Sequence, residues 1–191
     1  MIFYENVLRM RISHHDIYRI HQRLDTHIQE HAGIKTLYSF KIVPGFASDS
    51  AILLRTVQPM NLPGEKKTEI FLKKEDNVKF STTLAVMQRE MTNDRRRQIT
   101  PPPERLEEYI RNRLANAGFS VTSLVTGEPE NIIIKKRGRP ILIPATFLHA
   151  TCTISSVEEA EKALVYGVGR KRIFGFGFLM PFTVNTADAS C

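Results

Sequence analysis

The 191-residue sequence predicts an α+β protein made of two tandem domains. Three observations support this prediction. The 42% share of hydrophobic residues is typical of a folded globular chain. Each half of the chain combines strand-like segments with amphipathic helices. Residues 93–103, rich in arginine and proline, separate the two halves and indicate a linker.

The N-terminal half begins with a strand and a helix. Residues 2–12 alternate loosely between apolar and polar side chains and contain many residues that favour strands. Ser13 and Asp16 have capping-box spacing and Gly33 is a typical helix stop, which together predict a helix over residues 14–32. Its apolar side chains recur at helical intervals: Ile17, Ile20, Leu24 and Ile28.

Three more strands are predicted before the linker, over residues 37–43, 50–58 and 77–88. The order strand, helix, strand, strand, strand approximates the βαββαβ plan of a ferredoxin-like (RRM-like) domain whose second helix is lost. We therefore assign residues 1–92 to a first ferredoxin-like domain.

The C-terminal half repeats this pattern. The prolines at 101–103 favour a helix start, and a helical apolar face predicts a helix that ends at Gly118. A second helix is predicted from the capping-box serines at 155 and 156 to Tyr166. The predicted strands span residues 119–125, 131–136, 141–154 and 176–184. Residues 104–191 thus form a second ferredoxin-like domain.

Charge indicates the class of partner. The net charge of +7 and the pI near 9.6 favour an anionic partner, most often a nucleic acid. Ten of the 27 lysines and arginines lie in three short patches: Arg95, Arg96 and Arg97; Lys135, Lys136, Arg137 and Arg139; and Arg170, Lys171 and Arg172.

Several classes are disfavoured by what the sequence lacks. Two cysteines argue against a disulfide framework and a cysteine zinc site. No apolar run approaches the roughly 20 residues that span a bilayer, and the N-terminus lacks a signal-peptide layout, so we expect a cytoplasmic protein. His27 and His31 have chelating spacing but no evident third ligand, which favours a solvated helix face. We expect no metal and no cofactor.

A glycine-rich segment near the C-terminus predicts a loop that holds a polyanion. Gly167, Gly169, Gly175 and Gly177 surround the third basic patch, and glycine lets backbone amides approach a phosphate closely. The segment fits neither the Walker A pattern nor the dinucleotide fingerprint. The alternative is structural: a helix cap at Gly167 and a bulge at Gly175 and Gly177.

Tyr18 and His21 are a candidate pair for proton transfer. They are three residues apart on the predicted helix, and this spacing places both side chains on one face. From the sequence alone, a tyrosine at the core edge and a surface histidine are favoured. The basic patch at Lys135–Arg139 lies between two isoleucine- and leucine-rich runs, which predicts a basic hairpin that contacts phosphates. A solvated turn and an AT-hook, through Arg137-Gly138-Arg139-Pro140, are the alternatives.

Two of these segments resemble a known family. The loop Gly167-Val168-Gly169 … Gly175-Phe176-Gly177-Phe178-Leu179, before a terminal strand, resembles the glycine-rich signature of the CRISPR-associated RAMP proteins. Asp16-Ile17-Tyr18-Arg19-Ile20-His21-Gln22 is similar to the N-terminal helix motif of the CasE family, the precursor-CRISPR-RNA endoribonucleases of the Cascade system. Residues 38–43 and 52–59 resemble that family as well. The similarity covers most of the chain and is clearest at its two ends.

The resemblance implies a metal-independent endoribonuclease that cuts a repeat RNA at the base of its stem-loop and stays bound to the product. The implied reaction is attack of a ribose 2′-hydroxyl on the adjacent phosphate, which gives a 2′,3′-cyclic phosphate. His21 matches the family's catalytic histidine and Tyr18 its tyrosine neighbour. Arg172 stands where the family commonly has lysine, and the adjacent Lys171 can substitute. The implied partners are the repeat stem-loop and other subunits of a Cascade-like complex.

We expect RNA contacts from the basic patches and the loop: Arg95, Arg96, Arg97, Lys135, Lys136, Arg137, Arg139, Gly167, Gly169, Arg170, Gly175 and Gly177. Two other functions stay open. One is a non-catalytic RNA-binding RAMP subunit that keeps the fold and the loop. The other is a DNA-binding protein that uses the Arg-Gly-Arg-Pro motif in an A·T-rich minor groove.

Overall fold

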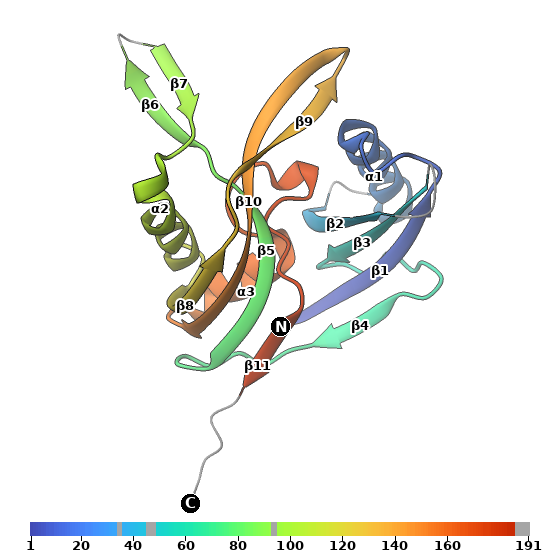
Figure 1. Ribbon diagram of the computed structural model, residues 1–191. Coiled ribbons are helices and arrows are strands. Elements are labelled where there is room, and N and C mark those ends of the chain that lie inside the picture. The colour runs from blue at the N-terminus through green and yellow to red at the C-terminus, as the bar shows by residue number, and fades with distance from the viewer. Residues whose placement is uncertain (34–35, 45–48, 93–94, 186–191) are drawn as a thin grey trace, which may run out of the picture.

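The computed structural model describes residues 1–33, 36–44, 49–92 and 95–185, without the side chains of residues 44, 89–92, 95–97 and 185 (Figure 1). Two antiparallel sheets lie side by side, with the N-terminal sheet on the right of the view and the C-terminal sheet on the left. Two long hairpins extend beyond the second sheet at the same end of the molecule.

The first sheet has the ferredoxin-like strand order. Its elements are β1 (Ile2–Met10), α1 (Ile17–Ala32), β2 (Tyr38–Pro44), β3 (Ser50–Thr56) and β4 (Lys66–Glu69), and the strands lie in the order β2-β3-β1-β4. Residues 57–65 between β3 and β4 form no helix, as the sequence predicts. Ile20, Leu24 and Ile28 attach α1 to the sheet by packing against Phe40 and Leu54.

The second sheet repeats this order with different elements. Its strands β5 (Asn77–Ala85), β8 (Phe119–Thr126), β10 (Arg139–Ile154) and β11 (Phe182–Asn185) lie in the order β11-β5-β10-β8. Helices α2 (Pro103–Ala115) and α3 (Val157–Tyr166) share one hydrophobic core with β5 and β10. The two strands contribute their even-numbered side chains to it, because successive strand residues point to opposite faces of the sheet. The prediction of two tandem ferredoxin-like domains is confirmed.

The hairpins are additions to this plan. β6 (Gln88–Thr92) and β7 (Arg95–Ile99) form one between β5 and α2. β9 (Glu130–Lys136) forms the other by pairing with residues 139–145 of β10, the part that extends beyond the sheet.

The boundary between the sheets differs from the prediction. The strand expected over residues 77–88 in the first domain is β5, and it pairs with β10 and β11 in the second sheet. β4 takes its place at the edge of the first sheet, and the polar sequence Lys-Lys-Thr-Glu carried no alternation that could reveal it. The expected linker 93–103 contains β7. The chain therefore passes from one sheet to the other between β4 and β5.

Two element ends also differ. α1 begins at Ile17 because the Asp16 side chain, and not that of Ser13, caps it by accepting a hydrogen bond from the Arg19 amide. The strand expected from residue 176 begins at Phe182. Gly175 and Gly177 have φ of +86° and +80°, outside the strand region, and Phe176 and Phe178 between and after them are buried in the core.

Helix α3 and residue Arg55 join the two sheets. α3 contacts β2 and β3 of the first sheet, whereas the hydrophobic core to which it contributes is that of the second sheet. Arg55 on β3 is only 4% exposed; it pairs with Glu5 at 2.8 Å and donates to the Leu164 carbonyl oxygen at 2.6 Å. Its guanidinium also lies over the rings of Phe3 and Phe178. In the described part of the chain, no helix has the length and apolar character to cross a membrane.

Candidate active site and nucleic-acid interface

Helix α1 presents three polar side chains, Tyr18, His21 and Asp25, along one face. Their spacing of three and four residues brings them into line on a helix. The face borders the buried stripe of Ile20 and Leu24, so all three side chains are half-buried. The predicted pair of Tyr18 and His21 thus lies at the edge of the core, where part of each side chain reaches solvent.

A tyrosine on β2 orients the histidine. Tyr38 Oη lies 3.3 Å from His21 Nδ1 and donates to Asp25 Oδ1 at 3.2 Å. Burial raises the pKa of Tyr38, and the charge and hydrogen bond of Asp25 raise it further, so the phenol stays protonated. Because its one hydrogen goes to the carboxylate, its oxygen accepts from His21 Nδ1–H. In that tautomer Nε2 carries the lone pair of the imidazole.

Tyr38 and Asp25 were not among the residues predicted from the sequence. Asp25 lies four residues after His21 on the predicted helix, so helical spacing alone could have identified it. Tyr38 gave no such signal, because its contact with α1 arises only when β2 takes its place in the sheet.

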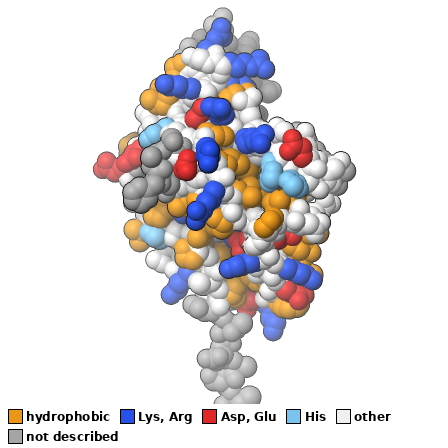
Figure 2. All heavy atoms as spheres, turned by 90° about the vertical axis from the view of Figure 1, so that its right-hand side faces the viewer, with side chains coloured by type: hydrophobic (Ala, Val, Ile, Leu, Met, Phe, Trp, Pro, Cys, Tyr) orange, Lys and Arg blue, Asp and Glu red, His pale blue; other side chains and the backbone are white. Residues whose placement is uncertain are grey.

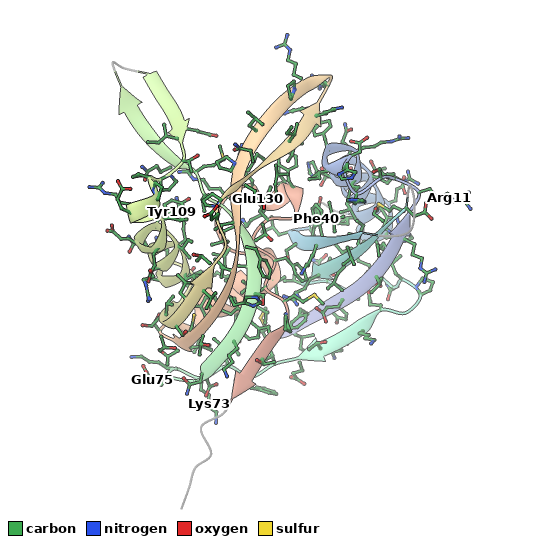
Figure 3. The ribbon with its side chains drawn as sticks, in the orientation of Figure 1. Arg11, Phe40, Lys73, Glu75, Tyr109 and Glu130 are labelled. Atoms are coloured by element: carbon green, nitrogen blue, oxygen red, sulfur yellow. The ribbon has the colours of Figure 1, made fainter. Side chains whose placement is uncertain are left out.

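The glycine-rich segment reaches this site through the short helix η1 (Arg172–Phe174). η1 contacts both α1 and β2, and the rings of Phe174 and His21 form a T-shaped pair with centroids 5.8 Å apart. A Cβ on Gly175 would lie 3.3 Å from the carbonyl oxygen of Phe40, so glycine permits this close approach. Figure 3 shows Phe40 in the region between the two sheets.

Gly167 and Gly177 serve the packing of the loop itself. A Cβ on Gly177 would overlap the Val168 carbonyl oxygen, and one on Gly167 would lie 3.0 Å from the Gly177 carbonyl oxygen. The Val168 amide donates to Gly177, whose own amide donates to Thr83 of β5. The two glycines therefore allow the two segments of the loop to pack directly against each other. RNA contacts by these glycines remain a prediction.

The cations of the loop have different surroundings. The Arg172 guanidinium donates weakly to the carbonyl oxygens of Tyr166 and Gly167, where α3 ends, which is a usual place for an arginine. Lys171 is half-buried, with φ of +61°, and directly precedes η1. Arg170 forms an isolated bridge to Ala85 and lines a different pocket, together with Tyr109 of α2.

The β9–β10 hairpin carries its basic patch beside the N-terminal end of α1. Arg137 and Gly138 form its turn, both with positive φ. The four cations of the patch are exposed, and Lys136 Nζ lies 5.9 Å from the centre of the Tyr18 ring. The predicted basic hairpin is thus confirmed as a structure, and it meets the helix face that carries His21.

A groove of about 1270 Å³ lies between this hairpin and α1. We call it the hairpin groove. Its helix side includes Ser13, His14, His15, Tyr18, Arg19 and Gln22, and its hairpin side includes Glu130, Asn131, Lys135, Arg137 and Gly138. The groove brings the predicted tyrosine and the predicted basic patch into one surface.

The family of CRISPR associated proteins has a sequence model that matches residues 11–181 of the chain. The chain belongs to this family. No curated protein sequence matches it.

Solved structures share the fold of this CRISPR-associated protein at low sequence identity. Thermus thermophilus Cse3, bound to an RNA representing a pre-cleavage complex, has a TM-score of 0.72 and 14% identity over 97% of this chain and 99% of its own. Escherichia coli K-12 Cas6e has a TM-score of 0.68 and 15% identity over 96% and 98%. A chain of a CRISPR RNA-guided surveillance complex has a TM-score of 0.66 and 17% identity over 95% and 98%.

Some predicted residues of this CRISPR-associated protein lie apart from the groove. Arg95, Arg96 and Arg97 lie on β7, and their side chains are outside the described part. His27 and His31 contact each other at 4.3 Å between ring centroids, and within the described ranges no group of three metal-binding side chains occurs. The hydroxyl of Ser81 contacts His149 at 2.6 Å on the second sheet, where the sequence indicated nothing.

Proposed function

We propose that this protein is a metal-independent endoribonuclease that cleaves precursor CRISPR RNA at the base of the repeat stem-loop and stays bound to the mature guide. The observation that carries the proposal is the histidine that Tyr38 orients, beside Tyr18 and the hairpin groove. The family match and the fold of RNA-bound Cse3 support it. The fold shared with a chain of a surveillance complex supports other subunits of a Cascade-like complex as partners.

The chemistry requires a base, an acid and a positive charge. The 2′-oxygen attacks the neighbouring phosphorus and loses its proton to a base. The bond from phosphorus to the 5′-oxygen breaks, that oxygen takes up a proton from solvent water, and a 2′,3′-cyclic phosphate remains. His21 Nε2 accepts the first proton in the tautomer that Tyr38 selects. Tyr18 orients the 2′-hydroxyl or the phosphate from the same helix face.

We assign the stabilising cation to Lys171 in preference to Arg172. Arg172 already donates to carbonyl oxygens at the end of α3, whereas the ammonium of Lys171, the residue directly before η1, forms no hydrogen bond or ion pair in the described part of the chain. Lys171→Ala should slow cleavage by roughly 10²- to 10³-fold, the usual loss for a group that stabilises transition-state charge. Arg172→Ala should slow it less than tenfold. Single-turnover rates of both variants check the assignment, and the reverse ranking would contradict it.

Tyr38→Phe tests the orientation of the histidine. The change removes only the hydroxyl between His21 and Asp25 and keeps the ring beside Phe40. We expect the single-turnover rate of cleavage to fall about 10- to 100-fold, as when a histidine loses the group that orients it. The dissociation constant of the stem-loop and the unfolding midpoint should stay close to those of the wild type. A loss of stability with an unchanged cleavage rate would show that the hydroxyl has only a structural role.

Incubation with a labelled repeat RNA tests the proposed function directly. In EDTA, the protein should cleave the stem-loop at one site and at the same rate as without EDTA. The upstream product should carry a 2′,3′-cyclic phosphate, which acid opens and phosphatase then removes. Loss of cleavage on chelation would contradict the metal-independent mechanism. Tight binding of the stem-loop without cleavage would instead favour the non-catalytic RNA-binding subunit, and preference for A·T-rich duplex DNA would favour the DNA-binding alternative.

A further inference from the structure

A second basic hollow lies on the other side of α1 from His21. It occupies about 750 Å³ between the end of β1 and the outer face of the helix. β1 and the residues after it contribute Arg9 and Arg11, and α1 contributes Arg19 and Arg23. We call it the arginine pocket. Figure 2 shows Lys and Arg side chains around apolar atoms on the side of the molecule where Figure 3 places Arg11.

The arginine pocket concentrates positive charge without an internal counter-charge. All four arginines are exposed, and in the described part of the chain none of them forms an ion pair. None of the described residues that line the pocket is acidic. Four like charges around one hollow repel one another, and an anion that enters it relieves this repulsion. The pocket therefore favours an anionic ligand that arginine can bind through several hydrogen bonds, such as a phosphate group.

The floor of the pocket is suited to more than a phosphate. Leu8, Met10 and Ile12 line it with apolar atoms. His27 also lines it, and its Nε2 is buried and has no hydrogen-bond partner among the described residues. Burial lowers the pKa of His27, and the nearby His31 lowers it further, so the ring is neutral near pH 7. An apolar floor with a neutral imidazole fits the face and edge of an unpaired nucleobase.

The arginine pocket is continuous with the hairpin groove. Arg19 and Gln22 line both of them, because these two residues lie on the part of α1 that separates the two hollows. A strand that leaves the groove beside Tyr18 can therefore pass over Arg19 and reach Arg23 and Arg9. The volume of the pocket matches that of a site for a ligand of about one or two nucleotides.

We propose that the arginine pocket binds the single-stranded RNA that flanks the scissile phosphate. The proposal rests on the proposed function, since the flank bound in the pocket belongs to the RNA that the proposed nuclease cleaves. The arginines hold the backbone phosphates, and the floor of Leu8, Met10 and Ile12 receives a base. An acidic protein segment would match the charge of the pocket, but it would not account for the connection between the pocket and the hairpin groove. The experiment below can detect binding of such a segment.

The test compares two RNAs that carry a 2′-deoxyribose at the scissile position, so that binding is measured without cleavage. One is the bare stem-loop, and the other has single-stranded flanks with 4-thiouridine in them. The variant Arg9→Ala/Arg23→Ala removes two charges of the pocket and leaves the shared Arg19 in place. Lys73→Ala/Lys74→Ala is the matched control, because both lysines are exposed before β5 and Figure 3 shows Lys73 far from Arg11.

The wild type should bind the flanked RNA about tenfold more tightly, and the pocket variant should lose this advantage. For that RNA alone, the slope of log affinity against log salt should fall by about 0.7 for each lost phosphate contact. The flank should crosslink to residues 8–27.

Equal binding of the two RNAs by the wild type, equal weakening of both by the variant, or competition only by an acidic peptide would overturn the proposal. Flank binding without cleavage of the unmodified RNA would contradict the proposed function and leave the pocket assignment standing.

Discussion

His21→Ala should reduce the single-turnover rate of RNA cleavage by about 10²- to 10⁴-fold, the range that general acid–base groups contribute. The expected loss is large because Tyr38 and Asp25 fix the tautomer of this one imidazole, and alanine removes the acceptor that they orient. The dissociation constant of the stem-loop should change less than about twofold, since the basic patch of the β9–β10 hairpin is untouched.

A second histidine on the same helix provides the control for this prediction. His31 is exposed in the last turn of α1, outside the hairpin groove, so His31→Ala should cleave at the wild-type rate. Imidazole added to His21→Ala should restore part of the activity, because it can occupy the vacated space and accept a proton. Unchanged cleavage by His21→Ala would refute the catalytic assignment.

Arg55→Met should lower the free energy of unfolding by about 3 kcal/mol. This value is at the low end of the range for breaking a buried ion pair, because the Glu5 carboxylate keeps some contact with water. Methionine fills a similar volume but cannot donate to Glu5 or to the Leu164 carbonyl oxygen, and it cannot lie as a cation over Phe3 and Phe178. Thermal unfolding should show a midpoint lower by roughly 6 to 12 °C.

Glu5→Gln/Arg55→Met tests whether the pair is the cause. Neutralising Glu5 removes the carboxylate that Arg55→Met leaves without its cation, so the double variant should be more stable than Arg55→Met. Cleavage should also slow in Arg55→Met, because Arg55 ties β3 to the end of α3, from which the glycine-rich segment continues to η1. A midpoint within about 1 °C of the wild type would contradict this role for Arg55.

Sequence patterns predicted those parts of the site that depend on neighbours along the chain. Tyr18 and His21 share a helix, and the Arg137–Gly138 turn lies between two β-rich runs, so local spacing was enough. Tyr38 could not be predicted in the same way, since its contact with His21 requires β2 and α1 to meet. The predicted boundary between the sheets differs from the observed one for a related reason. β5 alternates apolar and polar side chains, so either sheet could have accepted it, and only its pairing with β10 places it in the second sheet.

The glycine-rich segment shows how one pattern can have two meanings. Its glycines predicted a backbone open to a phosphate, whereas Gly167, Gly175 and Gly177 approach protein atoms of the loop and of β2. Both meanings require the absence of a Cβ, and sequence alone does not say which atom fills the space. The arginine pocket went unnoticed because Arg9 and Arg11 are separated from Arg19 and Arg23 in the sequence and form no cluster there.

Both added hairpins, β6–β7 and β9–β10, interrupt connections of the second sheet and leave its strand order unchanged. Length and charge at their tips can therefore vary without a change in the strand order of either sheet. Exchanging the β9–β10 tip between relatives should transfer preference for one repeat RNA while the helix that carries His21 stays as it is. Under the proposed function, the hairpin tip that would distinguish one repeat RNA from another is thus a separate element from the helix that carries His21.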